Sequence, residues 1–322
     1  MASATASALA SALMSTTAAA SAPPSSTVAA DAQALALAVA RPGDGGASEG
    51  DGGVAAEPEP PPPCPAEMAH VGRFCIDRYE AHLVVVAPDG KEAPHPHFSR
   101  PPEGVAVQAR SAPNVFPQAY ISRVEAKAAC QAAGKRLCHW LEWRRACQGR
   151  RWLRYPYSNA ARRGACNVGK DHLLPALFGH DAGAWKYEDH FNSPQLSQEP
   201  GFLARTGAHP ECESPDGVFD MVGNLHEWVA DMVTESFVER IEKEPVSRND
   251  QPWVVGNGMF LGGFYSTTNE HGPGCHFTTM AHEPSYHDYS TGFRCCATAR
   301  KPPKNKPAAK TTTQSKTKAR SR

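Results

Sequence analysis

The sequence lacks several features that identify common classes of protein. No apolar run reaches the roughly 18–20 residues that span a bilayer, so we expect no membrane-spanning segment. The formal net charge is zero, with 33 Lys and Arg against 33 Asp and Glu in 322 residues. This balance argues against specific nucleic-acid binding, which usually needs an excess of basic residues. The sequence also has no Cys-x-x-Cys pair, no phosphate-binding loop and no order of residues typical of a Ser-His-Asp triad.

The charges are distributed unevenly along the chain. Residues 1–63 contain one basic residue, Arg41, and six acidic residues, whereas residues 300–322 contain nine basic residues and no acidic one. Residues 64–299 keep the remaining 23 basic and 27 acidic residues. The neutral total is therefore the sum of an acidic head, a mildly acidic middle and a basic tail.

The two ends are predicted to be disordered. Residues 1–63 are rich in Ala, Gly and Pro and offer too few large apolar side chains to offset the entropy of ordering. The start has the small residues of a secretory signal, but it has no base before Arg41 and only a weak apolar stretch at 8–14. We interpret residues 300–322 as a solvated basic tail, and the alternative is an electrostatic tether to an anionic surface.

The middle of the chain is predicted to be one disulfide-rich domain. All ten Cys, all six Trp and all fourteen His lie within residues 64–299, which is long enough for one full core. An even number of cysteines without a zinc-ligand pattern favours disulfides. The cysteines therefore predict an extracytoplasmic location: periplasmic, cell-surface or secreted.

A few elements of secondary structure can be predicted locally. Ser122 and Glu125 have the spacing of a capping box, which predicts a helix that runs to about Ala133 and stops at Gly134. A second helix is expected over His139–Cys147, with Trp140, Trp143 and Cys147 on one face. Strands are expected at Leu83–Val86 and Val254–Leu261, and long loops at Tyr155–Asp220.

Three motifs occur in a fixed order. The first is AGKRLCHWLEWRRAC at 133–147, followed by YPYSN at 155–159; the second is DGVFDMVGNLHEWVAD at 216–231; the third is LGG at 261–263, completed by GFRC at 292–295. Together they resemble the sulfatase-modifying factor domain, the domain of the formylglycine-generating enzyme. The resemblance covers about residues 64–299. It implies an α+β fold: an irregular, loop-rich variant of the C-type lectin fold.

The resemblance also implies an activity from which this sequence departs. Formylglycine-generating enzymes oxidise a cysteine in a sulfatase peptide with two cysteines that bind copper(I), located between a Gly-Gly-Ser-Tyr element and a third cysteine. Here Gly262–Tyr265 matches that element and Cys275 matches the third cysteine, but residues 266–274 contain no cysteine. The residues present, Ser266, Thr267, Thr268 and Asn269, cannot replace thiolates as copper(I) ligands. We therefore predict a divergent, bacterial-type member without formylglycine-generating activity and without copper. Nor does the sequence contain the His-x-x-x-His-x-Glu pattern of the related non-haem-iron enzymes.

The resemblance further implies a calcium site and a set of disulfides. The family's cation ligands match the Asp220 side chain, the carbonyls of Gly223 and Leu225, and the Glu227 side chain; the alternative is a turn whose buried Glu bonds backbone amides. A weaker second site would begin at Asn167 and Val168. The resemblance pairs Cys130 with Cys295 and Cys147 with Cys275. We expect Cys64–Cys75 as a local bridge, and Cys166–Cys212 and Cys138–Cys296 as the remaining pairs.

These observations leave three hypotheses for function. The first is an exported binding or scaffold domain for a peptide, glycan or protein. The second is an oxidoreductase that uses other metal ligands, for instance a histidine-bound metal near the loop Gly262–Cys275. The third is a surface structural protein with its head and tail as tethers. We interpret His271, His276, His282 and His287 as scattered loop residues, because their spacing fits no ligand pattern.

Overall fold

The computed structural model describes residues 62–243, 253–268 and 271–301. The chain divides into two units, Met1–Glu59 and Pro60–Arg322, and the first lies wholly outside the described residues. The predictions of disorder for the head and the tail therefore fall almost entirely on residues outside the described part. No helix among the described residues is both long and apolar enough to cross a membrane.

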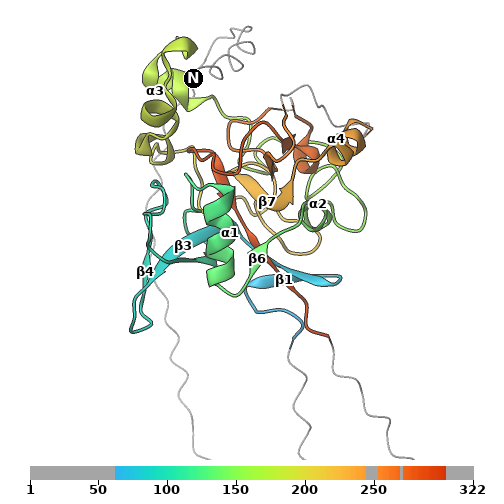
Figure 1. Cartoon of the computed structure of the whole chain (residues 1–322). Coiled ribbons are helices and arrows are strands. Elements are labelled where there is room, and N and C mark those ends of the chain that lie inside the picture. Colours follow the sequence, from blue (N-terminus) through green and yellow to red (C-terminus); the bar gives the residue numbers. More distant parts are fainter. Residues whose placement is uncertain (1–61, 244–252, 269–270, 302–322) are drawn as a thin grey trace, which may run out of the picture. The chain divides into compact units, whose positions relative to one another are not determined.

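The first sheet joins the beginning and the end of the domain (Figure 1). Its order is β1-β2-β11-β6, and every neighbouring pair is antiparallel. The strands are β1 (Met68–Val71), β2 (Phe74–Asp77), β11 (Cys295–Thr298) and β6 (Arg136–Leu137). Strand β2 pairs with β11 across more than 200 residues of sequence. The sheet therefore depends on long-range contacts, which form slowly during folding.

Two further sheets complete the β structure. The second has the order β10-β7-β8-β9, with a parallel pair between β10 and β7 and a register shift in the β7–β8 pair between Trp228 and Met232. The third is the antiparallel sheet β4-β3-β5. The strands are β10 (Thr291–Phe293), β7 (His226–Met232), β8 (Gly258–Leu261), β9 (Thr278–Thr279), β4 (Glu92–Pro94), β3 (Ala81–Val86) and β5 (Val107–Ser111).

The two predicted helices are confirmed, together with the reasons for their ends. Helix α1 (Arg123–Ala132) begins with the full capping box between Ser122 and Glu125 and is followed by Gly134 at φ 70°. Helix α2 (Trp140–Gln148) starts where Glu142 Oε2 accepts a hydrogen bond from the His139 amide at 3.0 Å. Its face that carries Trp140, Trp143 and Cys147 is buried, as the 3.6-residue period predicts. The described part of the chain also contains the α-helices α3 (Leu173–Phe178) and α4 (Glu235–Glu242).

Two predictions of secondary structure need correction. The strand expected at Val254–Leu261 begins only at Gly258, because Gly256 at φ 94° turns the chain and leaves Val254 and Val255 exposed. The segment 155–220 is mostly loop, as expected, but it also contains α3 and three short helical turns. Those turns are at Ala182–Ala184, Tyr187–Phe191 and Pro194–Ser197.

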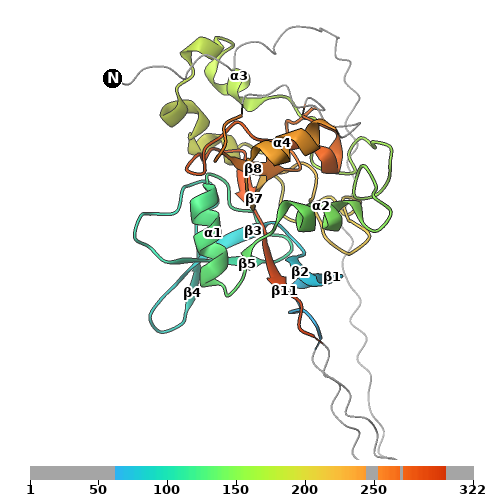
Figure 2. The same cartoon turned by 45° about the vertical axis from the view of Figure 1, so that its right-hand side comes forward.

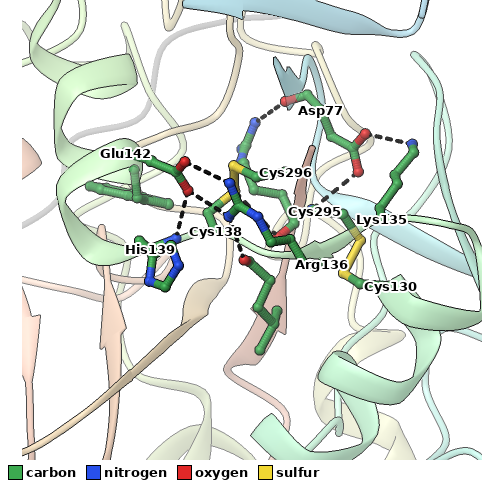
Figure 3. Close-up of a disulfide and its surroundings, with 12 residues drawn as sticks. Asp77, Cys130, Lys135, Arg136, Cys138, His139, Glu142, Cys295 and Cys296 are labelled. Carbon is green, nitrogen blue, oxygen red and sulfur yellow. Dashed lines mark hydrogen bonds and ion pairs between the residues drawn. A yellow bond between two sulfur atoms is a disulfide. The ribbon is translucent and has the colours of Figure 1, made fainter. Parts of the chain in front are cut away.

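All ten cysteines form disulfides, in the pairs expected from the sequence. Cys295 and Cys296 are adjacent on β11, and successive side chains of a strand point to opposite faces of its sheet. Cys295 therefore reaches Cys130 on α1, while Cys296 reaches Cys138 before α2 (Figure 3). Five disulfides are typical of proteins that fold in an oxidising, extracytoplasmic compartment.

An ion pair supports this stapled region. Asp77 Oδ1 accepts a hydrogen bond from Lys135 Nζ at 2.7 Å, and Asp77 Oδ2 accepts one from the Cys295 amide at 3.1 Å (Figure 3). Arg136 and Glu142 form a second pair beside the Cys138–Cys296 bridge. The sheet and both long helices are thus held together both covalently and electrostatically.

Candidate functional site

The loop that matches the catalytic region of the family begins at two glycines with a left-handed backbone. Gly262 and Gly263 have φ 84° and 76°, and a Cβ on Gly263 would lie 2.7 Å from the Thr267 side chain. The Thr267 hydroxyl accepts a hydrogen bond from the Phe264 amide at 2.8 Å, and the Thr267 amide donates to the Phe264 carbonyl at 2.9 Å. Thr267 thus closes a tight turn, and its hydroxyl already has a structural role.

No thiol remains near this loop. Cys275, which follows it, is bonded to Cys147 of α2, and the domain has no free cysteine. The side chains of Ser266 and Thr267 offer only hydroxyl oxygens, which are hard ligands, whereas copper(I) prefers soft thiolates. Residues 269 and 270 lie outside the described part of the chain.

His226 is a deeply buried ionisable group beside this loop. Its ring lies against Phe260, Phe264 and Phe277, with centroid distances of 4.6, 5.0 and 5.3 Å. Its Nδ1 is buried and has no hydrogen-bond partner among the described residues. Burial, followed by the nearby His282 and His271, holds the pKa of His226 well below its usual range, so the ring is neutral at pH 7.

The other predicted loop histidines do not form a metal centre with it. His282 stacks on Tyr286 with centroids 3.8 Å apart, and burial lowers its pKa to about 4. His276 contacts Arg144 and Gln148, whereas His287 lies against Tyr187. Within the described ranges, no three His, Cys, Asp or Glu side chains are grouped so that they could hold a metal ion.

The turn predicted to bind calcium contains a buried ion pair. Arg294 donates from Nε to Glu227 Oε2 and from Nη2 to Glu227 Oε1, both at 2.7 Å. Trp143 Nε1 donates to the same Oε2 at 2.7 Å. The remaining Arg294 hydrogen bonds reach the carbonyls of Asp77, Arg78 and Phe219. Both Glu227 oxygens are therefore already bonded, and a calcium ion would have to share them with Arg294.

Two more carboxylates lie in the same buried region. Glu80 accepts hydrogen bonds from the Leu225 amide at 3.1 Å and from Asn224 Nδ2 at 2.6 Å, while Asp220 Oδ2 accepts one from the Gly207 amide at 2.7 Å. Burial is the main cause that raises the pKa of Asp220 to about 6 and that of Glu80 well above its usual range. Three carboxyl groups thus lie near one arginine, and burial favours the neutral form of two of them, Glu80 and Asp220.

The weaker calcium position lies beside a lysine. Asn167 uses Nδ2 on the Phe202 carbonyl and on Asn224 Oδ1, at 2.9 and 2.8 Å, and its own Oδ1 is buried without a partner in the described part of the chain. Lys170 Nζ donates to the carbonyls of Gly201 and Phe202 at 2.5 and 2.9 Å. Val168 is exposed. The Lys170 ammonium and the Asn167 amide thus donate to the same Phe202 carbonyl, so a second ion would lie close to a positive charge.

The contact of Lys170 with the carbonyls of Gly201 and Phe202 could not be predicted from the sequence. Lys170 and Gly201 are 31 positions apart in the sequence, and no local pattern signals their contact. In contrast, Trp143, Glu227 and Arg294 all lie within the three family motifs, and all three side chains are buried. Motifs thus identify the buried centre of the site, whereas the contacts that compete with a cation appear only in three dimensions.

A shallow surface pocket of about 380 Å³ lies elsewhere on the domain. It is lined by Arg100, Tyr187, Glu283, Ser285, Tyr286 and His287. Several of its polar groups already have partners: Arg100 pairs with Glu125 at 2.6 Å, and the Tyr286 hydroxyl donates to Asp288 at 2.7 Å. The pocket therefore offers mainly ring surfaces to a ligand.

Comparison with known proteins places this geometry in a family. The family model of the sulfatase-modifying factor enzyme 1-like domain matches residues 44–299. A search of curated proteins finds no match.

Several solved structures are similar at low identity. PvdO from Pseudomonas aeruginosa is 16% identical over 70% of this chain and 80% of its own, with a TM-score of 0.39. The Major Tropism Determinant I1 variant is 13% identical over 74% of this chain and 54% of its own, with a TM-score of 0.40. The Treponema denticola variable protein 1 is 14% identical over 72% of this chain and 91% of its own, with a TM-score of 0.38. The family match, which covers most of the chain, shows that this protein belongs to the sulfatase-modifying factor family, with the α+β, loop-rich and disulfide-stapled fold expected for it.

Proposed function

We propose that this protein is an exported binding domain of the sulfatase-modifying factor family that does not form formylglycine. The observation that carries the proposal is that all ten cysteines are in disulfides. The family reaction needs a pair of thiolates for copper(I), and a cysteine in a disulfide cannot supply one. The scaffold is therefore kept while the reactive groups of the family are missing.

The bonds around the former catalytic loop support a structural role for it. Thr267 and Phe264 exchange two hydrogen bonds, and His226 lies neutral among three aromatic rings. Such a loop is well suited to hold a fixed surface for a peptide, glycan or protein ligand, because its shape does not have to change on binding.

Copper(I) binding by the purified, oxidised protein tests the proposal. We expect the protein to lose a competition for copper(I) against a chromophoric chelator, and the same result for Thr267→Ala as a matched control at the loop. Stoichiometric copper in the wild-type protein would overturn the proposal.

A second candidate is an oxidoreductase that uses a histidine-bound metal. The observation that favours it is His226, which is buried, neutral and without a hydrogen bond at Nδ1 from the described residues, since neutral imidazole is the form that binds metals. Metal analysis of the protein as isolated separates the two candidates. Stoichiometric iron or copper that is lost in His226→Phe would favour the enzyme, and its absence would favour the binding domain.

Calcium at the Asp220 turn is a further part of the proposal. The support for it is that three buried carboxyl groups lie near one arginine, and that the family resemblance adds the carbonyls of Gly223 and Leu225 as oxygen ligands. An ion that binds only the folded state raises its stability. Added calcium should raise the melting temperature, and Asp220→Asn, which keeps the Glu227–Arg294 pair, should abolish the rise. An unchanged melting curve in the wild type would leave only the ion-paired turn.

A further inference from the structure

The segment that follows α2 is strongly basic. Residues 149–165 contain five arginines and no acidic residue, and all five arginines are exposed: Arg150, Arg151, Arg154, Arg162 and Arg163. Among the described residues, the ion pairs of this segment comprise only that of Arg162 with Glu211, at 2.9 Å. The other four guanidinium groups thus face solvent without a carboxylate partner in the described part of the chain, within a domain that is mildly acidic overall.

This segment, which we call the arginine loop, is anchored at both ends. Cys147 and Cys166 flank it, and each forms a disulfide with a distant part of the domain, to Cys275 and Cys212. In Figure 2 the chain after α2 runs along the right-hand edge of the domain. The two ends of the loop are therefore held covalently before any ligand binds.

Hydrogen bonds and ring contacts also fix its interior. The Tyr155 amide donates to the Ser158 carbonyl at 2.8 Å, and the Arg154 amide donates to Asn159 Oδ1 at 3.0 Å. Tyr155 stacks on Tyr157, and the guanidinium of Arg162 lies over the Tyr157 ring at 4.7 Å. A loop held in this way loses little conformational entropy when it binds a ligand.

The exposed Trp152 is a second sign, independent of the arginines, that this loop binds a ligand. Its side chain is 64% exposed, and its backbone has φ 55°, the left-handed region that a bulky residue rarely adopts. An exposed ring contributes little to the core, so stability does not explain why a tryptophan stands here. Unfavourable backbone conformations of this kind are concentrated at ligand-binding sites. Trp and Arg are also the residues that contribute most often to binding energy at interfaces.

We propose that the arginine loop binds an acidic polysaccharide, a chain of sulfated or carboxylated sugars, with Trp152 stacked on a sugar ring. The planar guanidinium bonds sulfate and carboxylate oxygens in pairs, which suits Arg better than Lys. The flat, exposed indole offers its face to the apolar side of a pyranose. The five disulfides indicate an extracytoplasmic compartment, where such chains occur at surfaces. The inference rests on the proposed binding function and names the class of its partner.

A charge-matched pair of variants tests the role of the arginines. The probe is heparin, titrated into the full chain at physiological ionic strength. The triple variant Arg150→Gln, Arg151→Gln, Arg154→Gln should weaken binding by about tenfold or more. Each arginine that contacts the polyanion releases counterions from it, and the variant loses that favourable release. The control, Arg73→Gln, Lys127→Gln, Lys243→Gln, changes the net charge equally at exposed positions outside the loop and should alter binding by less than about twofold. Equal weakening by both variants, or no binding by the wild type, would overturn the proposal.

Trp152→Gly tests the ring without adding strain. Glycine adopts the left-handed backbone readily, so the melting temperature should not fall, whereas heparin binding should weaken by about fivefold. Unchanged binding would remove Trp152 from the site and contradict the proposal as stated. Trp253→Gly is the matched control, because Trp253 is also exposed but lies outside the loop.

A last comparison distinguishes an acidic polysaccharide from a nucleic acid as the ligand. Double-stranded DNA of similar charge should bind more weakly than heparin at the same salt concentration, and equal or tighter binding would contradict the polysaccharide assignment. Failure of these tests removes this partner and leaves the proposed binding function standing. Failure of the binding function itself would appear separately, as copper binding or peptide oxidation.

Discussion

Arg294 is the cation that the buried carboxylates share, and its removal is the most informative perturbation. It donates five hydrogen bonds, two to Glu227 and three to the carbonyls of Asp77, Arg78 and Phe219. Arg294→Met keeps much of the side-chain volume but removes the donor from every one of these acceptors. The Glu227 carboxylate would keep only its bond from Trp143.

The magnitude follows from the burial of the pair. The side chains of Arg294 and Glu227 are 0% and 1% exposed. Breaking a fully buried ion pair by removing one partner costs about 3–5 kcal/mol. In a domain of this size, 1 kcal/mol shifts the melting temperature by about 2–4 °C, so we expect a fall of about 10 °C at pH 7.

The assay is thermal unfolding at pH 7 and at pH 5, with the disulfides intact. Because the pKa of Asp220 is raised to about 6, acid neutralises one of the neighbouring carboxylates, and the deficit of Arg294→Met should shrink at pH 5. Arg145→Met is the control, since Arg145 pairs with the partly exposed Asp216 and should cost about 1 kcal/mol or less. Equal losses in the two variants, or a deficit that does not change with pH, would refute this reasoning.

Three further predictions test the remaining structural claims. The raised pKa of Asp220 means that the folded state binds its proton more tightly than the unfolded state does. This group therefore makes stability fall as pH rises from about 4 to about 6, and the slope of melting temperature against pH in this range should be smaller in Asp220→Asn than in the wild type. Ser122→Ala removes the cap of α1 and should cost about 1 kcal/mol in denaturant unfolding, whereas Ser122→Thr, which keeps the hydroxyl that donates to Glu125, should restore most of it. The double variant Cys130→Ala, Cys295→Ala should cost about 2–3 kcal/mol rather than about 5, because Cys138–Cys296 still closes the long loop and only about nine residues are released; a loss of about 5 kcal/mol would show that the two bridges act independently.

Local chemistry makes part of this fold predictable. The Ser122 and Glu125 pair and the glycines after each helix set the ends of α1 and α2, because caps act within a few residues. The pairs Cys130–Cys295 and Cys147–Cys275 and the turn at Asp220 follow from the resemblance to the family, whose motifs this chain keeps, whereas the resemblance does not give the other three pairs. The loss of the copper ligands needs only the sequence of the loop 264–274.

The other features depend on contacts between distant residues. The bond from Arg294 to Glu227 joins residues 67 positions apart, and it occupies oxygens that the motif alone assigns to calcium. The Lys170 ammonium and the strained Trp152 are likewise visible only in three dimensions. The predicted start of β8 is wrong because Val254 and Val255 have high β-propensity, while the turn at Gly256 decides where the strand begins.

Peptide oxidation gives the clearest test of whether this family member has kept the scaffold without the family chemistry. A peptide with the Cys-x-Pro-x-Arg motif is incubated with the oxidised full chain, copper and oxygen, and its mass is then measured. We expect an unchanged peptide, because every cysteine of the domain is in a disulfide. The loss of mass that marks conversion of the cysteine to formylglycine would contradict this conclusion.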